Sequence, residues 1–348
     1  TRTMEMPGEK LLIKLWETLA EKGIGSLLSP WQTIRDGKAR SEVRKHELLL
    51  LAQADSDAAD IRAGKKRLLP DGRLIESKNG ESGGPTLLIE STQRIEPAFT
   101  IESVADRGLT TAAADAARAE INATKAVIYA EELLAADAQE PPERGVDEDW
   151  ILNWRENAGR VSNEDLQKLW GSVLAGEVKA PGTYSIRTLD FLRTLSKTEA
   201  EQIALLATYA VEGRIIRSQK AHLDAKGVTF DLLLRMQELG VVSGVEAVGL
   251  NTQFRTQVVG TFIRALRSHG KALVVKHDDA TKEFQLEVYL LTSVGAQVLG
   301  LGSFTPDIEY LVQIGKQVVA MGFTVQLADW KQVSEWEGMY FNEVPIDA

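Results

Sequence analysis

The chain has no cysteine, and this absence excludes several kinds of protein at once. Without thiols there is no disulfide framework, no thiolate metal site and no cysteine nucleophile. Histidine is scarce, and the four residues are too scattered for a local HExxH-type metal pair. Walker A, G-x-G-x-x-G and G-x-S-x-G sequences are missing as well. The sequence therefore offers no assembled catalytic set, and we favour a non-enzymatic protein that needs no cofactor.

Long apolar runs are also missing. The longest obvious one, residues 48–52, is far shorter than the roughly 20 residues that a membrane-spanning helix needs. Near the start of the chain, Glu9, Lys10 and Lys14 interrupt the apolar positions, unlike the core of a signal peptide. Together with the lack of thiols, these features predict a cytoplasmic protein. A peripheral location at the inner membrane stays open, with residues 9–28 as the contact.

The net charge of −10 is unevenly distributed along the 348 residues. Residues 1–67 hold 13 Lys and Arg against 10 Asp and Glu, so the whole acidic excess lies in the remainder. Sequence-independent nucleic-acid binding needs several phosphates neutralised by basic side chains. The acidic body argues against it and makes the N-terminal part the better place for an anionic partner.

Residues 162–201 are the most informative stretch and predict short amphipathic helices around a Pro-Gly break. Ser162 followed by Asp165 makes an acidic variant of a capping box. Gly176 and Pro181–Gly182 are predicted to end the first helix. Its apolar positions recur at helical spacing: Leu166, Leu169, Trp170, Val173 and Leu174.

Two further helices follow, with Ser185 as the N-cap of one and Ser196, backed by Glu199, opening the other. The order of a Trp-bearing helix ending in LAGEV, a Pro-Gly turn and a helix reading SIRTLDFLRTLS resembles the Abi-alpha-like group of bacterial proteins. The resemblance covers residues 149–201 most closely. It extends toward Leu301, where YLLTSVGAQVL is similar to the group's terminal Leu-Thr-x-x-Gly helix.

That group is associated with abortive infection of phage-attacked cells. The resemblance therefore implies a non-enzymatic bacterial anti-phage protein that acts through protein or membrane contacts, with a phage component as one candidate partner. It transfers no active-site residues to this chain.

The N-terminal part, residues 1–68, predicts an amphipathic helix over Glu9–Lys22 and a long charged helix over Pro30–Leu68. Two apolar sets are candidates for self-association or membrane contact: Leu11, Leu12, Leu15, Trp16 and Leu19 in the first helix, and Leu48, Leu49, Leu50 and Leu51 in the second. Four consecutive leucines cover all sides of a helix, which favours a third element or a second subunit and hence a homo-oligomer, a dimer first. The alternative is that these side chains pack inside the same protein.

The rest of the chain predicts three further parts and an α+β fold that is mostly α. Residues 69–104 read as a loop or hairpin insertion. Residues 105–212 form a helical domain that contains the 149–201 signature, and its helix Ser103–Ala136 is expected to lie antiparallel to Pro30–Leu68.

Residues 213–348 form the last part, a winged-helix-like α+β domain with a C-terminal tail. We expect a helix at Val228–Leu239, then a hairpin of strands at Lys271–Lys276 and 284–290. A helix capped by Thr292 would close this order. The tail then adds a helix from residue 306, with Gly322 as its cap, and a strand. Its aromatic residues are expected to anchor a neighbouring subunit or to fold back onto their own domain: Trp330, Trp336, Tyr340 and Phe341.

The winged-helix-like order suggests a DNA-binding regulator as an alternative function. Its candidate phosphate contacts are five basic residues: Arg255, Arg264, Arg267, Lys271 and Lys276. Against this, the expected recognition helix carries only Arg235, flanked by Asp231 and Glu238, whereas base readout normally uses Arg, Lys, Asn or Gln.

A metal-dependent nuclease is a third alternative. Asp71, Glu76 and Lys78 match the residue types of a PD-(D/E)xK site, in which carboxylates hold Mg²⁺ beside a lysine. Their spacing is short, and a glycine-rich loop stands where core strands are expected.

Overall fold

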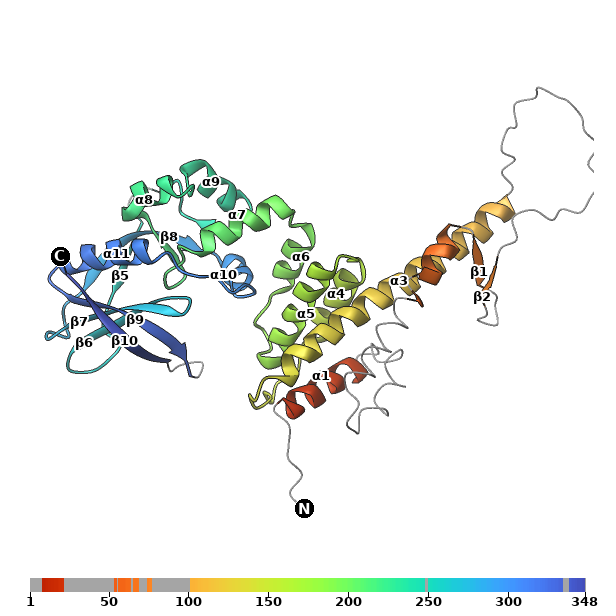
Figure 1. Ribbon diagram of the computed structural model, residues 1–348, viewed down its shortest axis with the longest axis horizontal. Helices are drawn as coiled ribbons and strands as arrows, with labels where there is room; N and C mark the ends of the chain where they lie inside the picture. The colour runs from red at the N-terminus through yellow and green to blue at the C-terminus, as the bar shows by residue number, and fades with distance from the viewer. Residues whose placement is uncertain are drawn as a thin grey trace, which may run out of the picture. The chain divides into compact units, whose positions relative to one another are not determined.

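The computed structural model describes residues 8–21, 53–54, 56–63, 65–68, 74–76, 101–247, 250–333 and 338–347 (Figure 1). It has a mixed α+β fold, as the sequence predicts, and every strand pairing among these residues is antiparallel. Within the described part of the chain, no helix is long and apolar enough to cross a membrane. The chain divides into two compact units, Thr1–Tyr184 and Ser185–Ala348. The division lies inside the 149–201 signature, whereas the sequence suggested a boundary near residue 212.

The first unit is a helical bundle built along one long helix, α3 (Ile101–Ala135). Helices α1 (Glu9–Glu21), α4 (Glu148–Gly159) and α5 (Glu164–Lys179) all contact α3, and Figure 1 shows α4 and α5 lying along it. The predicted helices over Glu9–Lys22 and Ser103–Ala136 are thus confirmed. Alanine side chains on α3 let its neighbours approach closely.

Buried tryptophans tie α4 and α5 together. The Nε1–H of Trp154 donates to the Trp170 carbonyl at 2.9 Å, and the Nε1–H of Trp150 donates to the Tyr184 carbonyl at 2.6 Å. All three indoles are almost fully buried and place a large apolar surface in the core, and the hydrogen bonds satisfy the polar atoms of Trp150 and Trp154. The signature tryptophans are therefore core residues, as their helical spacing predicts.

The apolar stripe of α1 packs inside its own unit. Leu11, Leu15 and Leu19 are fully buried, and α1 contacts α3 and α5. Leu12 and Trp16 are half-buried. Leu48–Leu51 lie outside the described residues. For the first helix, the structure supports packing within the protein, so these leucines are unavailable to a membrane or a second subunit.

The end of the predicted long helix is a correction. Residues 56–62 are helical, and Arg62 forms an ion pair with Asp115 of α3 at 3.2 Å. Lys66–Leu68 is instead strand β1, paired antiparallel with β2 (Leu74–Glu76). Strand pairing with β2, which follows the turn sequence Pro-Asp-Gly, overrode the helical propensity of these residues. The segment predicted as a loop or hairpin insertion therefore begins with a strand pair.

In the signature, the predicted N-cap of α5 was wrong, and one of the two predicted stops of that helix was wrong. The N-cap of α5 is Asn163, whose side-chain oxygen accepts from the N–H groups of Asp165 and Leu166. Ser162 instead accepts a hydrogen bond from Arg118. Gly176 does not end α5, which continues to Lys179 and stops just before the predicted Pro181–Gly182 break. Gly176 instead lies against the ring of Tyr184, where a side chain would collide.

The second unit begins with two helices whose predicted caps are confirmed. Ser185 caps α6 (Ile186–Thr194), and Ser196 with Glu199 forms a complete capping box on α7 (Lys197–Ala207). Strand β3 (Arg214–Ile216), a 3₁₀ turn at Arg217–Gln219 and α8 (Lys220–Ala225) come next. Helix α9 (Phe230–Glu238) then precedes β4 (Val242–Ser243) and β5 (Asn251–Phe254).

The predicted hairpin of strands 271–276 and 284–290 was wrong, although both strands exist. Strand β8 (Phe284–Leu291) pairs with β3, β4 and β5 in one sheet, ordered β3-β8-β4 with β5 also on β8. Strand β7 (Lys271–His277) pairs with β6 (Phe262–Ser268) in a separate sheet. A run of apolar residues made β7 recognisable and alternating apolar residues made β8 recognisable, but the local pattern did not show that they belong to separate sheets.

The second sheet has the order β10-β9-β7-β6, and α11 (Ile308–Ala320) packs on one of its faces (Figure 1). Strand β9 (Thr324–Gln332) joins β10 (Gly338–Ile346) in a hairpin, with a bulge between Phe341 and Val344. The aromatic tail thus folds back onto its own domain. Trp336 lies outside the described residues. Helix α10 (Ser293–Leu299) is capped by Thr292, as predicted.

Candidate functional site

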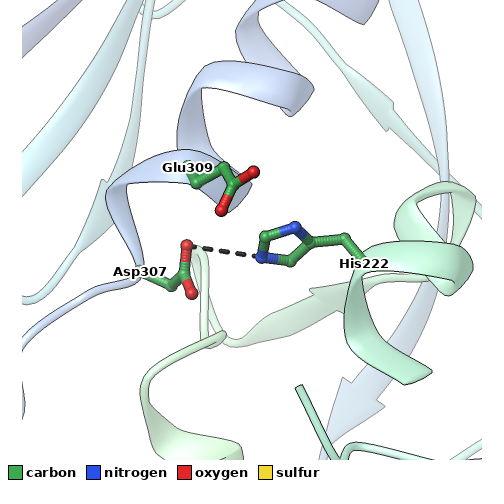
Figure 2. A group of neighbouring side chains, drawn as sticks. All are labelled: His222, Asp307 and Glu309. Carbon is green, nitrogen blue, oxygen red and sulfur yellow. Dashed lines mark ion pairs between the residues drawn. The ribbon is translucent and has the colours of Figure 1, made fainter. Parts of the chain in front are cut away.

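Three polar side chains from distant parts of the second unit meet at the start of α11 (Figure 2). His222 comes from α8, Asp307 is the N-cap of α11, and Glu309 lies in its first turn. The imidazole Nε2 is 3.4 Å from Asp307 Oδ1. One ligand atom from each residue lies within 4.8 Å of the other two. Figure 2 shows both carboxyl groups on the side of the ring that carries Nε2.

The imidazole of His222 is buried, with 6% of the side chain exposed. The imidazole ring lies beside the rings of Tyr209 and Tyr310, at centroid-to-centroid distances of 6.2 and 6.0 Å. Nδ1 lies 3.3 Å from the side-chain amide of Gln313. Nε2 has no hydrogen-bond partner, although Asp307 Oδ1 lies 3.4 Å away. Leaving such a buried polar atom unsatisfied typically costs about 1–3 kcal/mol, so the arrangement needs an explanation.

The carboxyl group of Asp307 is held in its ionised form. Burial works against ionisation, but the Tyr310 N–H, His222 and Lys226 outweigh it and lower the pKa of Asp307 below its ordinary value. The Tyr209 hydroxyl also donates to Asp307 Oδ2 at 3.4 Å. Full burial raises the pKa of the Tyr310 hydroxyl, which bonds to the backbone of β3. The cluster therefore presents a buried imidazole nitrogen beside an anionic oxygen.

The basic residues proposed as phosphate contacts mostly have anionic or aromatic partners within the second unit. Arg264 and Arg267 share Glu212, with Nη2 and Nε at 3.5 and 2.5 Å from its oxygens. Arg255 pairs with Glu283, and Lys271 with Asp329. Lys276 donates to Gln326 and lies 5.5 Å from the ring centre of Tyr340. Four of the five thus form ion pairs with three carboxylates, and Lys276 has a polar and an aromatic partner.

The residues proposed for a nuclease site are not brought together in the described part of the chain. Glu76 is exposed on β2, where its backbone is in register with Lys66 of β1. Asp71 and Lys78 lie outside the described residues.

The second sheet carries an exposed apolar surface that the sequence analysis did not predict. On β10, Met339, Phe341 and Val344 are 57%, 45% and 61% exposed. Because the bulge shifts the register by one residue, all three lie on the same face of the strand. We call them the β10 strip. The opposite face of the same strands, which carries Trp330 and Tyr340, borders a groove of about 670 Å³. Its lining includes Gln257, Val258, Ile263, Ala265, Arg267, Trp330, Met339 and Tyr340. The alternation of apolar residues after Gly338 was the available signal.

Comparison with known proteins adds one similarity. A family model described as a protein of unknown function (DUF2806) matches residues 113–215, from the middle of α3 through α7 to β3. No curated protein and no solved structure matches the chain.

Proposed function

We propose that the protein acts by binding another protein, as a non-enzymatic component of a bacterial anti-phage response of the abortive-infection type. The defence context rests on the resemblance of residues 149–201 to the Abi-alpha-like group. One observation supports the contact: the exposed apolar β10 strip lies on the edge strand of the second sheet. We assign its place of action to the cytoplasm, on the absence of cysteine.

The partner's chemistry follows from the geometry of the strip. Strand β10 stands at the end of its sheet and pairs only with β9 among the described strands. An edge strand can accept an extended segment of a second chain through backbone hydrogen bonds. Because Met339 and Phe341 are two residues apart on one face, the fitting occupant is an extended segment with apolar side chains at alternate positions. A phage component or a host protein can supply such a segment.

The finer fold that we propose for the second unit is a winged-helix-like arrangement. Its support is the chain order α7, β3, α8, α9, β4 and β8, together with the sheet order β3-β8-β4. Strands β6 and β7 would then be an insertion between the last two strands of that arrangement. Winged helices serve in protein docking as well as in DNA binding, so the arrangement is compatible with the proposed contact.

A DNA-binding regulator is the second candidate, and the same element order favours it. The charges speak against it. On α9, the exposed side chains include Phe230, Asp231, Arg235 and Glu238, an acidic rather than basic set. A mobility-shift titration with duplex DNA at two salt concentrations separates the candidates. Binding that weakens steeply with salt would favour the DNA-binding regulator.

Phage challenge tests the defence proposal. At least one phage of a broad panel should form fewer plaques on cells that carry the gene than on cells without it. Infected cells that carry the gene should die before they release phage progeny. The double variant Met339→Ser/Phe341→Ser should lose this protection, because it removes the apolar contact without touching the core. Leu152→Ser is the matched control: this side chain is 46% exposed on α4, in the first unit, whereas the strip belongs to the second.

Two results would contradict the proposal in distinguishable ways. Normal plaque formation across the whole panel by cells carrying the parent gene would remove the defence function. Full protection by the double variant would keep the defence function and remove the β10 strip from it.

Self-association remains part of the proposal, with a dimer as the first expectation. The buried stripe of α1 cannot supply the contact, so a dimer would have to use other surfaces. Sedimentation equilibrium of the full chain at micromolar concentration measures the mass directly. A strictly monomeric mass would end this part of the proposal.

A further inference from the structure

We propose that His222, Asp307 and Glu309 bind one divalent transition-metal ion, of the Zn²⁺ type, that joins α8 to the first turn of α11. The site would be independent of the β10 strip, and it goes beyond the proposed protein contact. It brings together one imidazole nitrogen and two carboxylates from two helices that are distant in sequence.

The spacing of the donor atoms fits such an ion. Zinc bonds to imidazole nitrogen and carboxylate oxygen are about 2.0–2.2 Å long, so neighbouring donors of a tetrahedral site lie about 3.4 Å apart. The separation of His222 Nε2 and Asp307 Oδ1 is 3.4 Å. A carboxylate oxygen of Glu309 lies within 4.8 Å of the other two donor atoms, and this side chain is exposed. A small side-chain rotation would therefore complete a set of three protein ligands. The fourth position would hold water.

The unsatisfied nitrogen is the independent observation that points to a ligand. A simple histidine–aspartate pair would direct Nε2–H along a hydrogen bond to the carboxylate. Here the buried Nε2 has no hydrogen-bond partner, although an anionic oxygen is 3.4 Å away. Donors of one metal ion approach one another without a hydrogen bond between them, which is the geometry observed.

The surroundings also suit a metal-bound imidazole. A ligating histidine usually uses its second ring nitrogen to donate to a neighbouring acceptor, which leaves the lone pair of the first nitrogen for the metal. Gln313 is placed 3.3 Å from Nδ1. If the Gln313 amide group turns by about 180°, its oxygen takes this place and accepts a hydrogen bond from Nδ1–H. Asp307 is itself oriented by the Tyr310 N–H at 2.8 Å.

The donor set selects the class of cation. Imidazole suits zinc and other transition metals, whereas Mg²⁺ and Ca²⁺ prefer oxygen ligands alone. The positive charge of Lys226 also stabilises the Glu309 carboxylate, since its Nζ is 3.6 Å from Glu309 Oε2. Lys226 therefore competes with the metal for Glu309, and its charge should weaken metal binding.

Calorimetric titration of the full chain with Zn²⁺, after removal of metal with a chelator, tests the site. We expect one equivalent to bind, with Mg²⁺ binding far more weakly. The variant Glu309→Gln removes an exposed ligand and should weaken binding by at least about tenfold, since even outer partners of metal ligands cost 10–100-fold. Lys226→Gln should bind more tightly than the parent. Glu238→Gln, an exposed carboxylate change on α9, is the control and should bind as the parent does.

Two further measurements keep the test sharp. Thermal unfolding of the parent should shift upward with Zn²⁺ concentration, because a ligand that binds only the folded state stabilises it. His222→Gln should abolish that shift. Equal Zn²⁺ affinity of Glu309→Gln and the parent, or weaker binding by Lys226→Gln, would overturn the ligand set. Binding by several weak equivalents that no variant alters would show an adventitious ion only.

Discussion

Replacing Gly171 of α5 by alanine tests how the first unit holds its helices together. A Cβ at this position would lie 2.7 Å from the Cβ of Tyr129, 2.8 Å from the Ala126 oxygen and 3.0 Å from the Ala130 nitrogen. Carbon atoms pack best at about 3.5–4.0 Å, so a Cβ here would overlap its neighbours rather than pack against them. The obstructing atoms belong to the backbone and Cβ of α3, so they cannot rotate away.

The expected net effect is a loss of about 2 kcal/mol of unfolding free energy. Overpacking a core typically costs about 1–3 kcal/mol, and the clash here is with backbone, which places the cost at or above the upper end. The better helix propensity of alanine returns about 1 kcal/mol. Urea unfolding followed by far-ultraviolet circular dichroism measures the difference, from the midpoint and slope of the transition that belongs to the first unit.

Gly108→Ala on α3 is the matched control, because no atom lies within 4 Å of a Cβ placed there. This variant should be more stable than the parent by about 0.5–1 kcal/mol, from helix propensity alone. If Gly171→Ala were as stable as the parent, or if both variants changed stability by the same amount, the close approach of α5 to α3 would not be what that glycine provides.

The remaining predictions concern polar groups in the two units. Burial raises the pKa of Glu177 above its unfolded value of 4.5, although backbone N–H groups of the following turn oppose this. The stability linked to its protonation is therefore fully present below about pH 4.5 and is lost as the pH rises through the folded pKa. Urea unfolding at a series of pH values should show the unfolding free energy of the parent rising relative to that of Glu177→Gln as the pH falls. A difference between the two free energies that does not change with pH would contradict this. Tyr310→Phe should cost about 1–3 kcal/mol, because it leaves a buried N–H of β3 without its acceptor; an unchanged melting temperature of the second unit would refute it. Asn163→Ala should cost about 1 kcal/mol of cap energy and Ser162→Ala less; thermal unfolding showing the reverse order would restore Ser162 as the cap.

Much of the helical structure was readable from the sequence, because its signals are local. The capping box at Ser196, the cap at Ser185 and the left-handed glycine after α11 each act within a few residues of a helix end. The stripe of α1 likewise predicted which side chains would be buried. Where two cap candidates were adjacent, as at Ser162 and Asn163, local pattern did not decide between them.

Strand partners and the His222 cluster were decided only by the tertiary structure. Apolar residues, consecutive in β7 and alternating in β8, marked both as strands. Strand β8 pairs with β3, β4 and β5, and β7 pairs with β9 as well as its neighbour β6, so their assignment to separate sheets depended on the packing of the whole unit. In the same way, the cap of α11 was visible in sequence, while its meeting with the imidazole of α8 was not. Helix ends depend on neighbouring residues, so the sequence indicates most of them to within a few residues. Contacts between distant segments require loops to close at an entropic cost that only the assembled core repays, and the sequence pattern of one segment does not identify the other.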